Sequence, residues 1–198
     1  MSFWTGTNVE LLYASTAAGA AKNTFTTEVA INDVATMGPR PLLPKGFFLA
    51  GRADSVGKAI YVRASGIVSS TATPTYTFTL RGGATGATTG AILLGSAALT
   101  TASGIANVPW YYEGYCVLEV LADGAASTLR GVGDICADGY SAATTTRTFP
   151  LWGNAASPGT VTTFDATIDN YINFNVACSA SSASNTITLH QLLVFGLN

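Results

Sequence analysis

Apolar and polar residues alternate with a period of two along much of this 198-residue chain. The clearest alternation covers residues 75–82, where Tyr76, Phe78 and Leu80 alternate with three threonines and an arginine. Since successive side chains of a strand point to opposite faces of a sheet, this pattern predicts a half-buried strand. Similar alternation predicts further strands over 24–31, 56–66, 107–120, 170–178 and 185–196.

The phase of each alternation predicts which residues face the core. Over 107–120 one phase is apolar and contains Trp110, Tyr112 and Cys116. The opposite phase mixes tyrosines with two glutamates, which is typical of a face covered by another layer or another subunit. In 170–178 we expect Ile172, Phe174, Val176 and Cys178 to point inward and Asn173 and Asn175 outward. In 185–196 one face is expected to carry Ile187, Leu189, Gln191, Leu193 and Phe195, and the other Thr186, Thr188, His190, Leu192 and Val194.

Turn-forming residues separate these segments. Residues 80–91 are rich in glycine, Asp123 and Asp138 each precede a glycine, and 37–46 contains three prolines and is expected to be extended. The number and spacing of the segments predict an all-β fold, an antiparallel jelly-roll-like β-sandwich of roughly nine or ten strands. We assign residues 23–198 to this single domain.

Residues 1–22 precede the first alternating segment, and we predict an N-terminal arm or a short helix there. Phe3 and Trp4 are large apolar side chains with little local sequence to bury them, and Leu11 and Leu12 follow. Such an arm either docks on a neighbouring molecule or folds back onto its own sandwich, and the sequence leaves both alternatives open.

The composition is poor in charge. Asp, Glu, Lys and Arg make up 10% of the chain, against about 25% in ordinary soluble domains, and the net charge is −2. The cations are scattered, so we expect no nucleic-acid partner. No apolar run of about 18 residues occurs, so we expect no membrane-spanning helix. A surface with weak charge repulsion favours packing against copies of the chain, which predicts a homo-oligomer.

Catalytic and metal-binding motifs are not indicated. Residues 51–59 resemble a phosphate-binding loop but have the wrong glycine spacing. His190 is the only histidine, and no G-x-S-x-G motif accompanies it. Glu113 and Glu119 are roughly 20 Å apart on one strand, too far for a catalytic carboxylate pair. We therefore predict a non-enzymatic protein with no cofactor and no metal site. Its three cysteines, Cys116, Cys136 and Cys178, are expected to be buried free thiols, with one disulfide pair as the alternative.

The aromatic residues at 110–115 are the most prominent feature left to explain. We interpret them as core and interface, which makes Tyr111 and Tyr115, together with Phe3, Trp4, Leu11 and Leu12, the candidate contacts with other subunits or a larger particle. An alternative is a glycan site, for which Trp152 in the segment 151–154 is the candidate contact.

The segments 43–70, 74–83 and 107–120 together resemble structural proteins of tailed bacteriophages, especially those infecting actinobacteria. The resemblance lies in a proline-led first strand, an Ala-Ser-Gly turn, a threonine-rich alternating strand and a Pro-Trp pair that opens an aromatic strand. It implies a virion component made in the bacterial host cytoplasm, most simply a capsid decoration protein or a minor head or tail protein. The implied partners are copies of the chain, with a trimer favoured, and the major capsid protein or other virion proteins. The alternative is a receptor- or carbohydrate-binding module of a phage tail.

Overall fold

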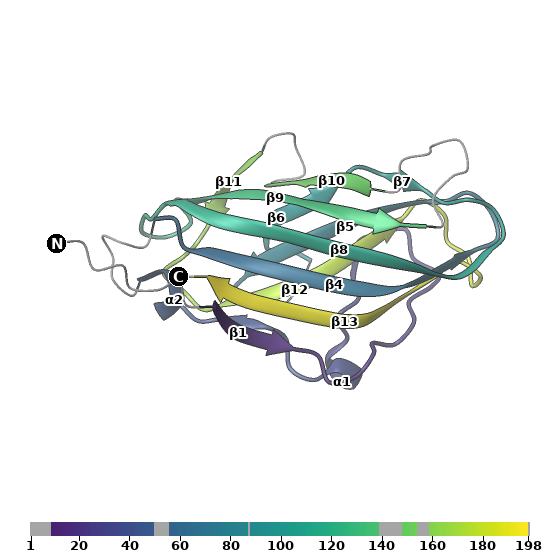
Figure 1. Ribbon diagram of the computed structural model, residues 1–198, viewed down its shortest axis with the longest axis horizontal. Helices are drawn as coiled ribbons and strands as arrows, with labels where there is room; N and C mark the ends of the chain where they lie inside the picture. The colour runs from purple at the N-terminus through teal and green to yellow at the C-terminus, as the bar shows by residue number, and fades with distance from the viewer. Residues whose placement is uncertain (1–8, 50–55, 87, 139–147, 154–158, 198) are drawn as a thin grey trace.

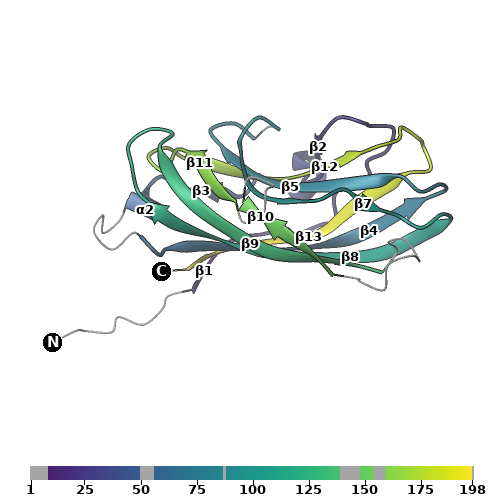
Figure 2. The ribbon, with the colours of Figure 1, turned by 90° about the horizontal axis from the view of Figure 1, so that it is seen from above.

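The computed structural model describes residues 9–49, 56–86, 88–138, 148–153 and 159–197, and the regular secondary structure of this part is almost entirely β-strand. Two layers face each other (Figures 1 and 2). The front layer, which faces the viewer in Figure 1, has the strand order β1 (Val9–Ala14), β13 (Thr186–Leu197), β4 (Ala59–Ser70), β8 (Ile105–Val120) and β9 (Ser127–Ala137). The back layer has the order β6 (Ala91–Ser96), β5 (Thr75–Gly83), β12 (Asn170–Cys178) and β2 (Val29–Ala30). The predicted antiparallel β-sandwich is confirmed.

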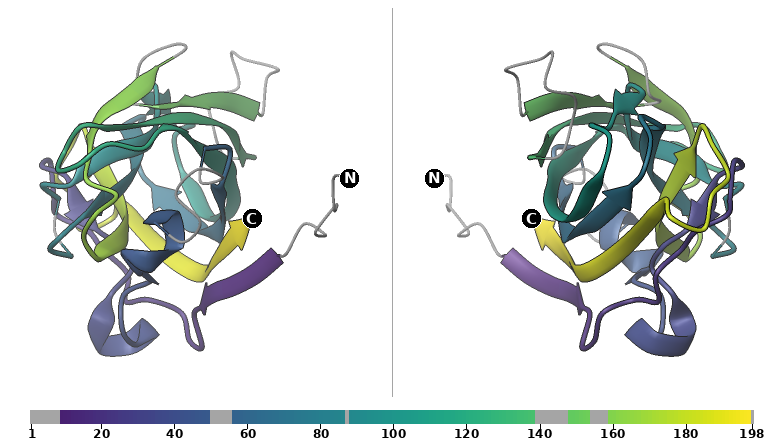
Figure 3. Two further views of the ribbon diagram at one scale, coloured as in Figure 1. Left: turned by 90° about the vertical axis from the view of Figure 1, so that its left-hand side faces the viewer. Right: turned by 90° about the vertical axis from the view of Figure 1, so that its right-hand side faces the viewer.

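Both sides of the sandwich are closed by the chain itself (Figure 3). On one side β10 (Thr148–Trp152) pairs with both β9 and β6 and so joins the layers. On the other side the chain leaves β1, donates a hydrogen bond from the Gly19 amide to the Leu189 carbonyl (2.8 Å), and reaches β12 where the Ile31 amide donates to the Phe174 carbonyl (2.9 Å). The N-terminal segment therefore pairs with the edge strand of each layer.

The remaining elements are short. The strands are β3 (Leu42–Leu43), β7 (Leu99–Thr100) and β11 (Thr160–Phe164), which pair with β12, β5 and β9, and the helices are α1 (Val34–Met37) and α2 (Gly46–Leu49). The proline-containing residues between the two helices are not helical, as predicted, because proline lacks an amide hydrogen and fixes its own φ.

The core between the layers is aromatic at its centre. Trp110 of β8 stacks on Phe174 of β12 with ring centroids 5.7 Å apart, and Tyr112 meets Phe174 edge-on at 4.6 Å. Both β8 residues are buried, as their phase predicted. Gly66 lies opposite Trp110 in β4, and a Cβ atom there would collide with the Thr188 carbonyl oxygen and the Trp110 ring. Glycine at this position is what lets the indole lie flat against its neighbour strand.

The predicted facing of the last strand is wrong beyond its middle. A β-bulge lies between Leu189 and Gln191, which pair with consecutive residues of β4, so His190 is the extra residue. Because one added residue inverts every later side chain, Leu192 and Val194 are buried, whereas Leu193 and Phe195 lie on the outer face.

Three further expectations are corrected or refined. The helix considered for residues 1–22 does not form over Val9–Ala14, which is a strand paired with β13; residues 1–8 lie outside the described part. Asn173 and Asn175 point away from the core but are buried, and Asn175 lies under the Glu28 carboxylate, to which it donates a hydrogen bond. All three cysteines are free; Cys116 and Cys178 are buried and Cys136 is half-buried. Among the described residues no helix has the length and apolar character needed to cross a membrane.

Candidate functional site

Large apolar side chains remain exposed in register on the outer face of the front layer. Cross-strand pairing aligns one residue from each of its five strands, and we call these residues the central row: Leu11, Phe195, Tyr61, Tyr115 and Val132. Leu11, Tyr115 and Val132 are exposed, and the other two are half-buried. A contiguous apolar patch of this kind on a protein surface is typical of an interaction site.

The rings of the central row stack on one another. The centroids of Tyr61 and Tyr115 are 4.4 Å apart with planes inclined by 21°, and Tyr61 and Phe195 are 5.9 Å apart at 27°. Since neighbouring strands are about 4.8 Å apart, rings stacked across them stand upright on the sheet. Their faces cover each other and their edges point to solvent, so the row is a ridge and not a flat platform.

A charged row lies beside the central row, two residues along each strand. It aligns Leu193, Arg63, Glu113 and Asp134. Arg63 Nε is 3.8 Å from Glu113 Oε2, and the Tyr61 hydroxyl donates a hydrogen bond to that same oxygen at 2.9 Å. Partial burial, this hydrogen bond and the charge of Glu113 raise the pKa of Tyr61 to about 12. The charges are thus ordered across the sheet, with the cation on β4 and the carboxylates on β8 and β9.

A hollow of about 440 Å³ lies next to the charged row. The next row along the strands aligns Gln191, Ser65, Tyr111 and Cys136, and these four side chains line the hollow together with Arg63, Glu113 and Asp134. Tyr111 is 58% exposed, and within the described part of the chain its ring stacks on no other ring. Ser65, its cross-strand neighbour, is small. A protruding ring and a depression therefore lie side by side.

The contacts predicted from sequence divide into three groups. Tyr111, Tyr115 and Leu11 are exposed on the front layer, and the structure brings Tyr115 and Leu11 into one row. Leu12 is half-buried and packs against the hydrophobic core. Phe3 and Trp4 lie outside the described residues, as does the Trp152 side chain, although the Trp152 backbone pairs with Val132.

Sequence reasoning missed Tyr61, Arg63 and Phe195. The first two were accessible from the predicted strand 56–66, because Tyr61 and Arg63 alternate with the apolar Ile60 and Val62 and must point to the opposite face. Phe195 was not accessible, since its orientation depends on the bulge at His190.

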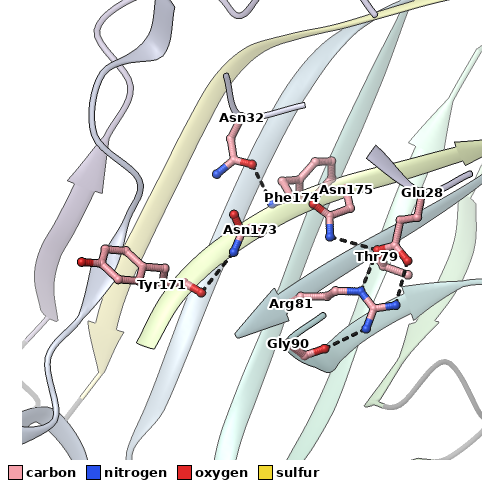
Figure 4. Close-up of polar contacts among 9 residues, drawn as sticks. All are labelled: Glu28, Asn32, Thr79, Arg81, Gly90, Tyr171, Asn173, Phe174 and Asn175. Atoms are coloured by element: carbon pink, nitrogen blue, oxygen red, sulfur yellow. Dashed lines mark hydrogen bonds and ion pairs between the residues drawn. The ribbon is translucent and has the colours of Figure 1, made fainter. Parts of the chain in front are cut away.

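The outer face of the back layer has a different character (Figure 4). Glu28 lies over β5 and β12, and its carboxylate accepts hydrogen bonds from the Thr79 hydroxyl, from Arg81 Nε and Nη2 at 2.7 Å each, and from Asn175 Nδ2 at 2.9 Å. Burial by itself raises the pKa of Glu28, but the hydrogen bonds from Arg81, Thr79 and Asn175 and the charge of Arg81 outweigh it, so the pKa is lowered. The network fixes residue 28 to the layer.

Asn32 continues this attachment four residues later (Figure 4). Its Nδ2 donates to the Ile172 carbonyl at 3.2 Å, and its Oδ1 accepts from the Phe174 amide at 3.1 Å. The side chain thus occupies the hydrogen-bonding positions that a neighbouring strand would use along β12.

Groups of three or more His, Cys, Asp or Glu side chains placed to hold a metal ion do not occur among the residues that the structure describes. His190, at the bulge, is exposed. The buried thiol of Cys116 has a raised pKa because of its burial, which disfavours the thiolate.

The chain was compared with protein families, curated proteins and solved structures. No protein-family model matches the chain, and no curated protein is similar to it. Among solved structures, the CBM2 module of the evolved Dit protein of Lactobacillus casei BL23 phage J-1 aligns over 97% of each chain, with 11% sequence identity and a TM-score of 0.35. A similarity this low assigns neither a fold family nor a ligand to this chain.

Proposed function

We propose that this protein is a non-enzymatic structural component of a phage virion that binds other proteins through the outer face of its front layer. The observation that carries the proposal is the central row, five apolar side chains in register across five strands with no covering layer in the described part of the chain. The resemblance of the sequence to phage structural proteins supports a role in a virion, and we favour capsid decoration as that role.

The energetics of the face support this role. On the outer face of the back layer, Glu28 binds Arg81 and Asn175 in a polar network, whereas the front layer presents an uncovered row of Tyr, Phe, Leu and Val side chains. Each Å² of apolar area removed from water contributes about 25 cal/mol, and tyrosine is enriched at protein interfaces. Repetition over many copies on a particle multiplies a modest contact into strong attachment.

The test is binding to particles. Purified protein is mixed with phage particles assembled without it, and bound protein is measured after sedimentation. We expect the wild type to bind and Tyr115→Ser/Val132→Ser to lose binding at least about tenfold. Tyr171→Ser is the matched control, because Tyr171 is an exposed tyrosine on the back layer. Equal binding by the central-row variant and the wild type contradicts the proposal.

A second candidate function is carbohydrate binding at the hollow. It is favoured by Tyr111, whose unstacked ring lies beside Arg63, Glu113, Asp134 and Gln191. Carboxylates and an amide accept hydrogen bonds from sugar hydroxyls, and a guanidinium donates them. The stacked rings of the central row do not support this role, because their faces already contact each other.

This second function is tested with cell-wall polysaccharide from the host and with a glycan array. Retention by either that disappears in Tyr111→Ala and persists in Tyr171→Ala supports it. Wild-type protein that binds no host polysaccharide and no arrayed glycan eliminates it.

A further inference from the structure

The order of residues on the outer face specifies the partner more closely than its apolar character does. In the charged row, Arg63 of β4 lies directly opposite Glu113 of β8. A two-fold axis parallel to the strands and above the gap between β4 and β8 exchanges these two strands. It therefore brings Arg63 of one copy over Glu113 of the other copy, and the reverse, so that both contacts join opposite charges.

The row that contains Tyr111 and Ser65, on one side of the charged row, is also self-complementary under this rotation. Tyr111 of β8 pairs with Ser65 of β4, so the rotation brings the protruding Tyr111 ring of one copy over the small Ser65 of the other. The hollow lies at that place, since Arg63, Ala64 and Ser65 line it from β4. A two-fold pair thus has two protruding rings and two depressions that receive them, which is the self-complementarity of an isologous interface.

The central row, on the other side of the charges, is compatible with the exchange. Tyr61 of one copy comes over Tyr115 of the other, and Phe195 comes over Val132, so apolar groups meet apolar groups. Aligned sheets pack about 10 Å apart and cross at about 30°, and the crossing displaces residues near the axis least. The contacts that such a crossing preserves best are therefore those made by β4 and β8, the two strands beside the axis.

From these three matches we propose that the outer face of the front layer binds a second copy of this chain through a two-fold axis between β4 and β8. This inference rests on the proposed function, because it names the partner that the same face binds when no particle is present. A trimer, which the sequence analysis favoured, joins this face to a different one and leaves the match of Arg63 with Glu113 and of Tyr111 with Ser65 unused.

The experiment is a charge exchange between two variants. Arg63→Glu makes both positions acidic and Glu113→Arg makes both basic, so in a two-fold pair of either variant like charges face each other twice. In a mixture of the two, each acidic position faces a basic one. Both residues are more than half exposed, so the substitutions leave the core unchanged. Lys45→Glu, a charge reversal at an exposed turn before α2, is the matched control.

Mass is measured by light scattering after size exclusion over a range of concentrations. We expect the wild type and Lys45→Glu to approach twice 20.3 kDa. Each single reversal raises the dimer dissociation constant at least about tenfold, and the equimolar mixture restores it to within about threefold of wild type. Ser65→Trp, which fills the depression and keeps the charges, also dissociates the pair.

Three results overturn the inference. They are a wild type that stays monomeric up to the highest concentration, a dimer that neither reversal weakens, and single reversals that weaken a dimer without rescue in the mixture. A monomeric wild type that still binds particles through Tyr115 and Val132 removes the two-fold pair and leaves the proposed function intact. If the equimolar mixture restores the dimer but Tyr115→Ser/Val132→Ser binds particles as well as the wild type does, the proposed function fails and the two-fold pair stands.

Discussion

On the outer face of the back layer, the Glu28 side chain binds polar side chains of β5 and β12, whereas the outer face of the front layer carries its apolar row uncovered. On the back, Arg81 and Glu28 form a short ion pair that is largely shielded from water; on the front, Arg63 and Glu113 form a longer pair that is more than half exposed. The same two residue types therefore have different tasks. Buried pairing holds the chain to itself, and exposed pairing leaves charge available for a partner.

Removing the cation from each pair gives the largest expected contrast. Arg81→Ala leaves the Glu28 carboxylate shielded without its cation, and we expect it to lower the free energy of unfolding by about 3 kcal/mol. Arg63→Ala removes an exposed partner, with an expected loss below about 0.5 kcal/mol. Urea unfolding of both variants measures the difference. Similar losses for the two would mean that the faces do not differ as described.

The attachment by Asn32 is tested next. Asn32→Ala leaves the Phe174 amide and the Ile172 carbonyl without their side-chain partner, and we expect a loss of about 1–2 kcal/mol in the free energy of unfolding. Asn23→Ala, at an exposed position in the same segment, is the control and is expected to change stability by less than about 0.5 kcal/mol. An Asn32 variant as stable as the control argues against a stabilising attachment of Asn32 to β12.

The pKa of Glu28 predicts how the back-face network depends on pH. Since the folded-state pKa is lowered from the ordinary 4.5, the ionised carboxylate stabilises the fold fully above that value, and the contribution is lost as the pH falls through the folded-state pKa. We expect wild type to be more stable than Glu28→Gln at pH 7 and the gap to shrink below pH 4.5. Unfolding at several pH values measures the gap, and a gap independent of pH contradicts the assignment.

The smallest effect is expected on the front face. Tyr61→Phe removes the hydrogen bond to Glu113 and keeps the ring stack with Tyr115 and Phe195. The bond is exposed, so we expect the free energy of unfolding to change by less than about 0.5 kcal/mol. A loss of unfolding free energy comparable to that of Asn32→Ala would mean that this hydrogen bond stabilises the fold, which contradicts a face available for binding.

The sequence predicts the parts of the fold that depend on local alternation. The inward phases of β5 and β8 follow directly from residues such as Phe78 and Trp110, because a strand's period is set by its own backbone. The burial of Asn175 does not follow, since the residue that covers it, Glu28, is far away in the sequence. Phe195 was misassigned for a related reason, because the bulge at His190 is defined by pairing with β4.

The candidate surface was predicted in part for the same physical reason. Tyr111 and Tyr115 were named from the phase of their own strand, and both are exposed. The order of charges and the hollow beside Ser65 required the register between β4 and β8, which no local pattern contains. The facing of residues within one strand could be predicted from the sequence, whereas the alignment of residues on different strands could not.

The pairing of the first described strand with the last one, Val9 beside Leu197, sets the order in which this protein can be completed during its synthesis. Strand β1 has no place to bind until β13 has left the ribosome, and Ile31 must likewise wait for β12. Contacts so distant in sequence form slowly, and the open edges of β12 and β13 are exposed to other nascent chains in the meantime. Strand β1 therefore joins the fold only after β13 is available, although it is synthesised well before β13.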